Sequence, residues 1–567
     1  MKRCVLLIML LMILAFSGCK QPEIGTTPST TTTAPVIECK KHMLSELSGC
    51  CRICGMPYFE VALEYELNET KDGYVVMGPG ISKRTDIVIP ATYKGLPVTE
   101  IGEKAFYYDP YESDTAFCNE ITSVVIPGSV TKIGKLAFAV CGSLKTVELS
   151  KGLKEIGESA FAACGSLTEL VIPEGVTTIG YCAFYNSPQL IRLELPDSVT
   201  TLGVAAIGLC PKLTSIRIPS SITEIPEEFA GSCTSLKTVE MGPDVSRIAT
   251  KAFAGCTALE TFDCGSKVTF IGSQAFDGCT SLTTVNLSQT VKEIGSAAFK
   301  DCTLLSSINI PDAIEILEVN AFAGCTAIPC TVYEGMKYFG TAGSPYMILL
   351  SKADENVMDV VAHKDTRFIQ SDVLGQNGIN SISLGEHVSE FPFTQIRKLE
   401  VAPSLIIDPN NKHYRIVNNC LIKTRTKTLL QAYEGFVIPE DGSVTVIGDK
   451  AFAGLATAEV IIIPDCVVEV GVGAFTNCAA LRILVFGSGV QKIGVNVLSS
   501  KNNLSAVYFK GTKDAWENME GLEVFTIMGM QASNNPTLLA LPCYFYSETQ
   551  VNGTGYWHYV DGEPTLW

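Results

Sequence analysis

The apolar positions of this chain repeat with a period of 23 residues over most of its length. The segment "VTKIGKLAFAVCGSLKTVELSKG", from Val130 to Gly152, is followed directly by "LKEIGESAFAACGSLTELVIPEG". Copies begin at Val130, Leu153, Val176, Val199, Ile222, Val245, Val268, Val291 and Ile314, and later ones begin at Val444, Val467 and Val490. Such regular steps indicate one structural unit that is stacked many times in a solenoid.

Within each copy, the pattern predicts a short strand followed by a turn. Leu144, Val147 and Leu149 alternate with polar residues, so we expect them to point inward from one strand. The following segment is expected to cross the convex side and to bury residues such as Ile133 and Phe138. The period and the L-x-x-V-x-I spacing are typical of a leucine-rich repeat solenoid. We therefore predict short parallel strands that form a concave sheet, with an irregular convex side.

One position of the repeat is mostly cysteine. It is occupied by Cys118, Cys141, Cys164, Cys210, Cys233, Cys256, Cys279, Cys302, Cys325 and Cys478, with Ser187 and Leu455 in two further copies. Stacked strands lie about 5 Å apart, which is within disulfide range, so bridges between copies are one alternative. Parallel side chains point the same way, however, and Ser187 or Leu455 would leave a neighbour unbridged. We interpret the column as free, buried thiols.

The first residues indicate export. Two basic residues precede the apolar run "VLLIMLLMILAF", which is too short for a membrane-spanning helix but suits a signal peptide. The stretch "FSGC", ending at Cys19, resembles a bacterial lipobox, although Phe16 departs from the usual Leu. It implies a lipoprotein signal peptide at 1–18 and lipidation of Cys19, which would anchor the exported chain at the cell surface or on an outer leaflet. A signal peptide without lipidation and an uncleaved anchor are the alternatives.

A Thr/Pro-rich stalk at 19–37 separates this segment from a small Cys/His segment at 38–58. In the latter, Cys39 and His42 form one pair and Cys51 and Cys54 form another, each with two residues between its members. Four such ligands would close a tetrahedral, structural zinc site of the knuckle type. One or two disulfides are the alternative, which export favours. Structural zinc is the single cofactor that the sequence suggests.

Charge and motif content bear on the class of function. The 567 residues carry a formal net charge of −17, which disfavours a nucleic-acid partner. No phosphate-binding glycine loop, nucleophile elbow or zinc-protease motif is present in the sequence. The histidines all lie outside the regular copies, at His42, His363, His387, His413 and His558. We therefore predict that the chain is not an enzyme.

The repeat phrase "VTxIGxxAFxxCxxLxxVxIP" resembles that of the BspA-like leucine-rich repeat proteins of host-associated bacteria. The resemblance covers about residues 60 to 567 and includes the interruption "YEGMKYFGTAGSPYMILL" and the hairpin "IIDPNNKHYRIVNNCLIKTRTKTLLQAY". It implies a surface lipoprotein that adheres to host or bacterial surface proteins. The chain is accordingly divided into an N-terminal array at 59–330, degenerate repeats with a hairpin at 331–435, a second array at 436–510 and a C-terminal cap at 511–567.

The exposed row of the concave sheet is the predicted protein-binding surface. In the first array it presents Glu148, Glu169, Arg192, Glu194, Arg217, Glu240, Asp263, Asn286 and Asn309. These mostly acidic or polar side chains suit a basic or polar protein partner. A solvated face without a partner, as in a structural spacer, is the alternative. Carbohydrate capture would need aromatic platforms, of which the columns offer only Tyr508.

The outward positions of the last copies are apolar instead. This patch consists of Val460, Ile462, Ile483, Val485, Ala506 and Tyr508. Such a patch is either an interaction site or a surface that the chain itself covers. We expect the C-terminal segment to cover it, because that segment carries Trp516, Tyr544, Tyr546, Trp557 and Trp567.

Overall fold

The computed structural model describes residues 63–80, 84–374, 378–396, 403–499, 503–527, 530–549, 555–560 and 563–566, and two short antiparallel strands, β1 (Glu38–Cys39) and β2 (His42–Met43). The chain forms two compact units. The first comprises Met1–Ala353 and Gln370–Val373, and the second comprises Asp354–Ile369 and Leu374–Trp567. Within the described ranges, every helix is too short or too polar to span a lipid bilayer.

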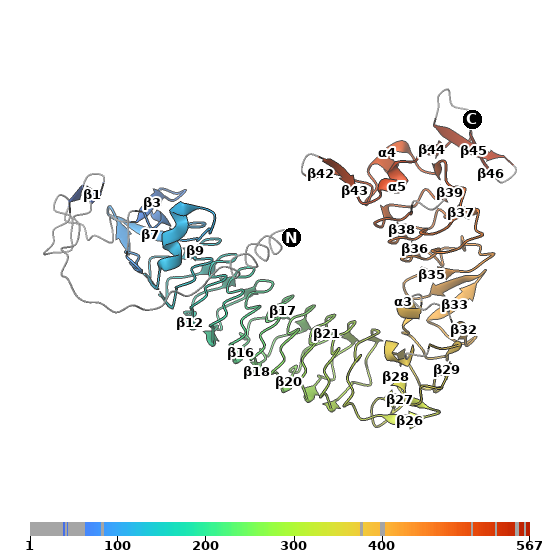
Figure 1. Ribbon diagram of the computed structural model, residues 1–567, viewed down its shortest axis with the longest axis horizontal. Helices are drawn as coiled ribbons and strands as arrows, with labels where there is room; N and C mark the ends of the chain where they lie inside the picture. The colour runs from blue at the N-terminus through green and yellow to red at the C-terminus, as the bar shows by residue number, and fades with distance from the viewer. Residues whose placement is uncertain are drawn as a thin grey trace, which may run out of the picture. The chain divides into compact units, whose positions relative to one another are not determined.

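The first unit is built on a row of short parallel strands, here called the first row. Where neighbouring strands pair, most partners are 23 residues apart, as Glu169 and Arg192 or Arg217 and Glu240 are, while Asp86 pairs with the more distant Ser123. The row consists of β5 (Asp86–Val88), β8 (Ser123–Ile126), β10 (Thr146–Leu149), β12 (Glu169–Val171), β14 (Arg192–Glu194), β16 (Ser215–Arg217), β18 (Thr238–Glu240), β20 (Thr261–Asp263), β22 (Thr284–Asn286) and β24 (Ser307–Ile308). Figure 1 shows these rungs stacked in chain order. The predicted leucine-rich repeat solenoid is confirmed.

A second row of two-residue strands follows the first row in every rung, where the sequence predicted only a return segment. Its strands are β9 (Lys132–Ile133), β11 (Glu155–Ile156), β13 (Thr178–Ile179), β15 (Thr201–Leu202), β17 (Glu224–Ile225), β19 (Arg247–Ile248), β21 (Phe270–Ile271), β23 (Glu293–Ile294) and β25 (Ile316–Leu317). They pair in parallel with the next rung, and β9 pairs with β7 (Leu96–Ile101) at the start of the array. The strands β3 (Glu64–Leu67), β4 (Tyr74–Gly78) and β6 (Thr92–Tyr93) precede β7 in the sequence. The 3-10 helix Ser113–Glu120 follows β7, before the next rung.

The second row is interrupted once, between β15 and β17. In intact rungs the N–H after the strand donates to the previous rung, as Gly203 does to the carbonyl of Ile179 at 2.8 Å. The equivalent residue after β17 is Pro226, which has no N–H to donate. The pairing resumes one rung later, where the N–H of Ala249 donates to the carbonyl of Ile225 at 2.9 Å. Pro226 thus explains why the second row forms two separate sheets.

Aromatic rings from successive rungs form the centre of the core. Phe106, Phe138, Phe161 and Phe184 are fully buried, and their nearly parallel rings have successive centroid distances of 5.0, 5.2 and 5.9 Å. Each such pair contributes about 0.5–1.5 kcal/mol beyond simple area burial. Because each ring is covered by its neighbours, a single copy could not bury its own apolar side chains.

The regular array ends in an antiparallel group, β26 (Thr331–Tyr333), β27 (Met336–Phe339) and β28 (Ile348–Lys352). The second unit starts with degenerate repeats, in which regular rungs are replaced by less regular parallel strands. Its parallel first-row strands are β29 (Asp359–Val361), β31 (Ser381–Leu384) and β32 (Ser404–Ile407), accompanied by β30 (Phe368–Ile369) and α3 (Phe393–Ile396). Most of the 3-10 helix Ser371–Leu374 lies in the segment Gln370–Val373, which belongs to the first unit. An antiparallel hairpin module follows, with β33 (Tyr414–Val417), β34 (Cys420–Lys423) and β35 (Thr428–Ala432).

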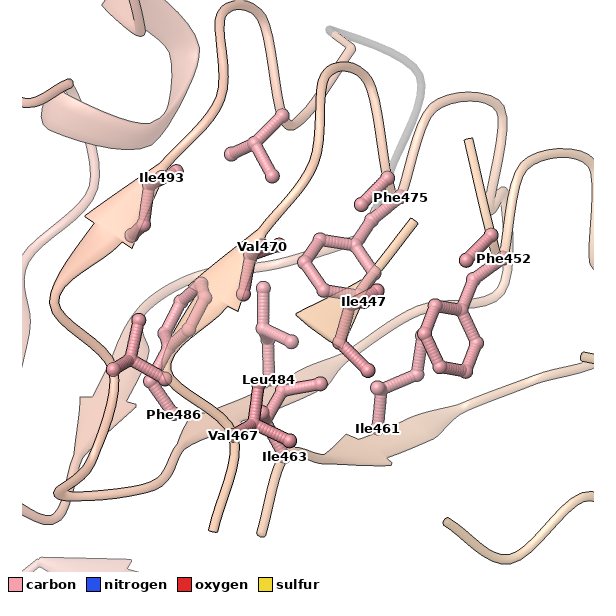
Figure 2. Close-up of a cluster of buried hydrophobic side chains, with 14 of the residues drawn as sticks. Ile447, Phe452, Ile461, Ile463, Val467, Val470, Phe475, Leu484, Phe486 and Ile493 are labelled. Carbon is pink, nitrogen blue, oxygen red and sulfur yellow. The ribbon is translucent and has the colours of Figure 1, made fainter. Parts of the chain in front are cut away.

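Regular rungs then resume on the hairpin module. The second row consists of β36 (Val446–Ile447), β38 (Glu469–Val470) and β40 (Lys492–Ile493), of which β36 pairs with β35. The first row consists of β37 (Val460–Ile462), β39 (Ile483–Phe486) and β41 (Val507–Phe509). Figure 2 shows the core between them, where Phe452, Phe475 and Phe486 lie among aliphatic side chains.

The C-terminal segment continues the first row of the second unit. Strand β41 pairs in parallel with β44 (Cys543–Tyr546), β44 with β45 (Tyr556–Val560), and β45 pairs antiparallel with β46 (Glu563–Leu566). The intervening elements are α4 (Lys513–Glu517), β42 (Val524–Ile527), β43 (Met530–Ser533) and α5 (Pro536–Leu539). The sheet edge that β41 would otherwise present is therefore paired with the chain's own strands.

Candidate protein-binding face

The outward side of the first row in the first unit, here called the first-row face, carries the predicted binding residues. The strand pattern places alternate residues inside and outside, so that Leu170 is buried while Glu169 and Val171 are exposed. All the predicted residues of this face are exposed, namely Glu148, Glu169, Arg192, Glu194, Arg217, Glu240, Asp263, Asn286 and Asn309. Strand register brings several of them side by side.

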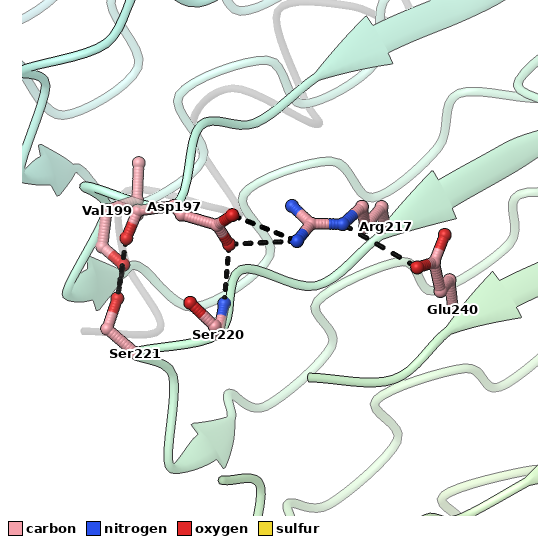
Figure 3. A network of polar contacts seen from close by, with 6 residues as sticks. All are labelled: Asp197, Val199, Arg217, Ser220, Ser221 and Glu240. Carbon is pink, nitrogen blue, oxygen red and sulfur yellow. Dashed lines mark hydrogen bonds and ion pairs between the residues drawn. The ribbon is translucent and has the colours of Figure 1, made fainter. Parts of the chain in front are cut away.

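The centre of the first-row face is a network of opposite charges around Arg217 (Figure 3). Its Nη2 donates to both carboxylate oxygens of Asp197 at 3.0 Å, and its Nε lies 3.6 Å from Oε1 of Glu240. The backbone N–H of Ser220 donates to Asp197 at 2.9 Å. These hydrogen bonds, first that from Arg217, lower the pKa of Asp197 to about 2, and the same contact raises the pKa of Arg217.

Asp197 is a site residue that the sequence pattern did not single out. It lies in the turn after β14, one rung before Arg217, and not in the outward columns of the strands. Its only signal in the sequence is an acidic residue directly after Pro196, at the end of a strand. Exposed ion pairs of this kind add little stability. Their effect here is to hold the guanidinium of Arg217 in one orientation on the surface.

An open hollow of about 540 Å³ lies over this network. It is lined by charged side chains of both signs and by the exposed apolar side chain of Val171. The charged lining residues are Glu174, Arg192, Glu194, Arg217 and Glu240. Arg192 also forms an ion pair with Glu194 on the same strand. The hollow thus offers oriented donors and acceptors beside a small apolar contact area.

Two predicted residues at the far end of the face have structural contacts. The amide of Asn309 accepts from the N–H of Leu287 at 2.7 Å and donates to its carbonyl at 2.8 Å. The side chain of Asn309 therefore takes the place of a backbone hydrogen-bonding partner beyond the end of β24. Asp263 accepts from the N–H of Gly265 at 2.8 Å and shapes the turn after its strand. The hollow around Arg217 is accordingly the better candidate for partner contact.

The apolar patch of the second unit lies beneath the chain's own C-terminal strands. Ile483, Val485 and Ala506 are buried, and Val460, Ile462 and Tyr508 are half-buried. Trp557 on β45 is fully buried against this surface, and its Nε1 donates to the carbonyl of Phe509 at 3.4 Å. Trp516 packs elsewhere, against the core rings of Phe486 and Phe509. Trp567 lies outside the described residues.

The cysteine column is a structural element of the core. The cysteines of the described residues are free thiols, and most are buried. From Cys164 onward, each thiol of the cysteine column donates to a carbonyl 26 residues earlier, as Cys164 does to Phe138 at 3.3 Å and Cys233 to Ile207 at 3.1 Å. Cys141 donates to the carbonyl of Phe106 instead. Burial raises the pKa of Cys164 and of Cys233 to about 12. These thiols are thus poor nucleophiles at neutral pH.

The predicted lipid and zinc sites lie mostly outside the described residues. This is so for Cys19, Cys51 and Cys54, while the backbones of Cys39 and His42 face each other as a pair in β1 and β2. Lipidation of Cys19 and zinc binding stay predictions. In the described part of the chain, no group of three or more His, Cys, Asp or Glu residues is placed to hold a metal ion.

Comparison with known proteins agrees with the repeat pattern and the fold. The family described as "BspA type Leucine rich repeat region" matches in six copies over residues 99–237, 209–329 and 431–529, more than half of the chain. No curated protein matches. A solved leucine-rich repeat protein from T. pallidum is 31% identical and covers 35% of this chain and 88% of its own, with a TM-score of 0.32. One from Bacteroides ovatus is 19% identical and covers 85% and 98%, with a TM-score of 0.40.

A leucine-rich cell surface protein from Faecalibacterium prausnitzii is 21% identical and covers 81% of this chain and 96% of its own, with a TM-score of 0.30. The family and the fold are those of leucine-rich repeat proteins, which are generally not enzymes. From its repeats, this chain belongs to the BspA-type leucine-rich repeat family.

Proposed function

We propose that this chain is a non-catalytic protein of the cell surface that binds other proteins through the first-row face. The observation that carries the proposal is the hollow around Arg217, where charges of both signs are fixed by ion pairs beside exposed Val171. A lipid on Cys19 would tether the chain to the membrane, and the partners would be host or bacterial surface proteins. Dense display on a membrane would make weak contacts multivalent.

The chemistry of the face favours a protein partner over a carbohydrate. Sugar capture generally relies on exposed aromatic platforms, whereas the outward residues of β10 to β22 are Thr, Ser, Glu, Arg, Asp, Asn and Val. Fixed charges give specificity and association rate when the partner presents complementary charges. With Glu148, Glu194 and Glu240 in one column, the expected partner surface is rich in Lys and Arg.

The test is binding of the full chain to immobilised host matrix proteins and to bacterial surface proteins. The triple variant Glu148→Lys, Glu194→Lys, Glu240→Lys reverses the column of acidic side chains, and we expect it to lose binding. A matched control changes Glu155, Glu224 and Glu293 of the second row to Lys. Its net charge is the same, so non-specific electrostatics would affect both variants alike.

Loss in the first variant alone would support the proposal. Equal binding by wild type and both variants would overturn it and would favour a spacer that contacts no specific partner. Equal loss in both variants would also overturn it, because the effect would then follow net charge and not the first-row face.

A further inference from the structure

A group of basic side chains in the second unit lies apart from the first-row face. Its members, here called the basic cluster, are Arg367, His387, His413, Lys423 and Arg425. They gather on one part of a chain whose formal net charge is −17. A local reversal of sign of this kind creates a positive potential that attracts anions.

Hydrogen bonds between neighbouring rungs bring the first members together. The backbone N–H of Ser389 donates to the carbonyl of Arg367 at 2.8 Å, so the rung that carries His387 stacks directly on the rung of Arg367. The hydroxyl of Tyr414 donates to the carbonyl of Ser389 at 2.9 Å. This contact sets β33, and with it the preceding His413, against the same rung.

The hairpin β33–β34 supplies the remaining members. Tyr414 and Lys423 are paired residues of the two strands, and the N–H of Thr424 donates to the carbonyl of His413 at 2.8 Å. Arg425 follows directly and is exposed. Residues separated by nearly 60 positions in the sequence therefore meet on three successive layers of the fold.

The carboxylate of Glu390 lies beside Lys423 in the cluster. Nζ of Lys423 lies 2.6 and 2.8 Å from the two carboxylate oxygens of Glu390, and both side chains are largely buried. Glu390 thus neutralises Lys423. Burial and then positive neighbours lower the pKa of His413, and the charges that act on it are those of Lys423, Arg367, Arg425 and His387.

The aromatic rings of this region are already covered. The guanidinium of Arg367 lies 5.0 Å from the centroid of the Phe368 ring, and Nζ of Lys423 lies 6.0 Å from that of Tyr414. Phe368 and Tyr414 are themselves buried. Single-stranded nucleic acids are held by stacking of bases on exposed aromatic rings, so the basic cluster is a poor fit to them.

The different exposure of the five side chains also distinguishes between classes of ligand. His387 and Arg425 are exposed, whereas Arg367, His413 and Lys423 are half-buried. A flat layer of lipid headgroups would contact mainly the two exposed members. A single flexible chain that carries anionic esters can also approach the half-buried Arg367 and His413, while Lys423 is engaged by Glu390. Guanidinium groups bind sulfate-like oxyanions through paired hydrogen bonds, and such esters stay ionised at every physiological pH.

We propose that the basic cluster binds the sulfate esters of an anionic polysaccharide. This ligand would be separate from the protein partner of the first-row face, and neither interaction requires the other. The chain would then have two contact surfaces, one of mixed charge in the first unit and one basic in the second.

The test uses the full chain with heparin as the probe and N- and O-desulfated heparin as the matched ligand. The variant Arg425→Glu reverses the most accessible cation, and we expect it to weaken heparin binding by about tenfold, the effect of one lost charge-assisted hydrogen bond. His387→Glu should act in the same direction. The control Lys513→Glu makes the same charge change on α4, where the lysine is exposed, and should shift the affinity by less than about twofold.

Three results would overturn the proposal. The first is that wild type binds desulfated heparin as tightly as heparin. The second is that Arg425→Glu and Lys513→Glu weaken binding equally, which would indicate a net-charge effect. The third is equal binding, through Arg425, to single-stranded DNA, polyglutamate or phosphatidylserine vesicles, which would show a general anion site. Thermal melting of each variant establishes that the fold is intact.

Discussion

The hydroxyl of Ser187 donates a hydrogen bond of 3.3 Å to the carbonyl of Phe161, in the place that a thiol occupies in neighbouring rungs. Cys210 makes the same bond to Phe184 at 3.3 Å. The column therefore selects a small buried side chain with a hydrogen-bond donor. Its other exception, Leu455, follows the hairpin module, where Leu429, 26 residues earlier, pairs with Ile447 of the second row and is not the counterpart of Phe161 or Phe184. Buried carbonyls without a donor are costly, which accounts for the hydroxyl at Ser187.

Replacing a cysteine of the column by a residue without a hydrogen-bond donor should destabilise the protein more than replacing it by serine. In Cys233→Ala, the carbonyl of Ile207 loses the thiol that now donates to it at 3.1 Å, and a small cavity forms. We expect a loss of about 1–3 kcal/mol in the free energy of unfolding. Cys233→Ser keeps a donor, as Ser187 does, and should lose less than half as much. Denaturant unfolding of both variants measures this, and a serine variant less stable than the alanine variant would contradict it.

The ladder thiols should be silent in the native protein and reactive after unfolding. Burial raises the pKa of Cys164, Cys233 and Cys279 to about 12, so that at pH 8 about one in 10,000 of each is thiolate. Exposed Cys330 should be labelled in the native state and serves as the internal standard. Alkylation followed by peptide mass spectrometry assigns each cysteine. Ladder cysteines that stay unlabelled in denaturant would indicate disulfides instead.

The periodic sequence predicts the rungs because one apolar pattern recurs at equal steps, but it predicts poorly what depends on neighbouring rungs. A segment such as Lys132–Ile133 contains one buried side chain, so nothing in its own pattern distinguishes a strand from a loop. Its strand character comes from backbone pairing with β7 and β11. Asp197 was missed for the same reason, since its role depends on Arg217 of the next rung. The basic cluster was missed because its members lie in degenerate repeats.

The interruption at Pro226 should be visible in hydrogen exchange. The N–H groups of Thr200 and Thr201 both donate to the carbonyl of Thr177, at 2.9 and 3.1 Å. Strand β17 is not paired with β15, so the amides of Thr223 and Glu224, the equivalents of Thr200 and Thr201, should exchange faster than those two. Exchange followed by mass spectrometry compares these peptides directly. In Pro226→Gly, which restores an N–H, protection of β17 should rise, and uniform protection across wild-type rungs would refute the interpretation.

Trp557 should be essential to the C-terminal sheet. Its side chain is fully buried over Ile483 and Val485 and contacts Tyr508 with a ring-centroid distance of 5.4 Å. Trp557→Ala should destabilise this end by about 3–5 kcal/mol and expose an apolar surface that promotes association. Val560→Ala, an exposed site on the same strand, is the control. Light scattering and dye binding test this, and a monomeric, dye-negative Trp557→Ala protein would argue against a covering role.

Protonation of His413 should contribute to the pH dependence of the stability of the protein. Burial, followed by the positive charges of Lys423, Arg367, Arg425 and His387, lowers its pKa in the folded state below the ordinary value of 6.5. Protonation therefore favours the unfolded chain, so this contribution to stability is present above pH 6.5 and is lost as the pH falls through the folded pKa.

The variant His413→Gln cannot be protonated and should not lose this contribution. The melting temperature of the variant minus that of wild type should therefore rise as the pH is lowered from about 7.5 to 5.5. Carboxylates titrate equally in both proteins and cancel in the difference. Heparin bound at the basic cluster would offset the repulsion, so its stabilising effect on wild type should grow at the lower pH. A difference in melting temperature that is constant or falls would show that burial and the neighbouring cations do not lower the pKa of His413.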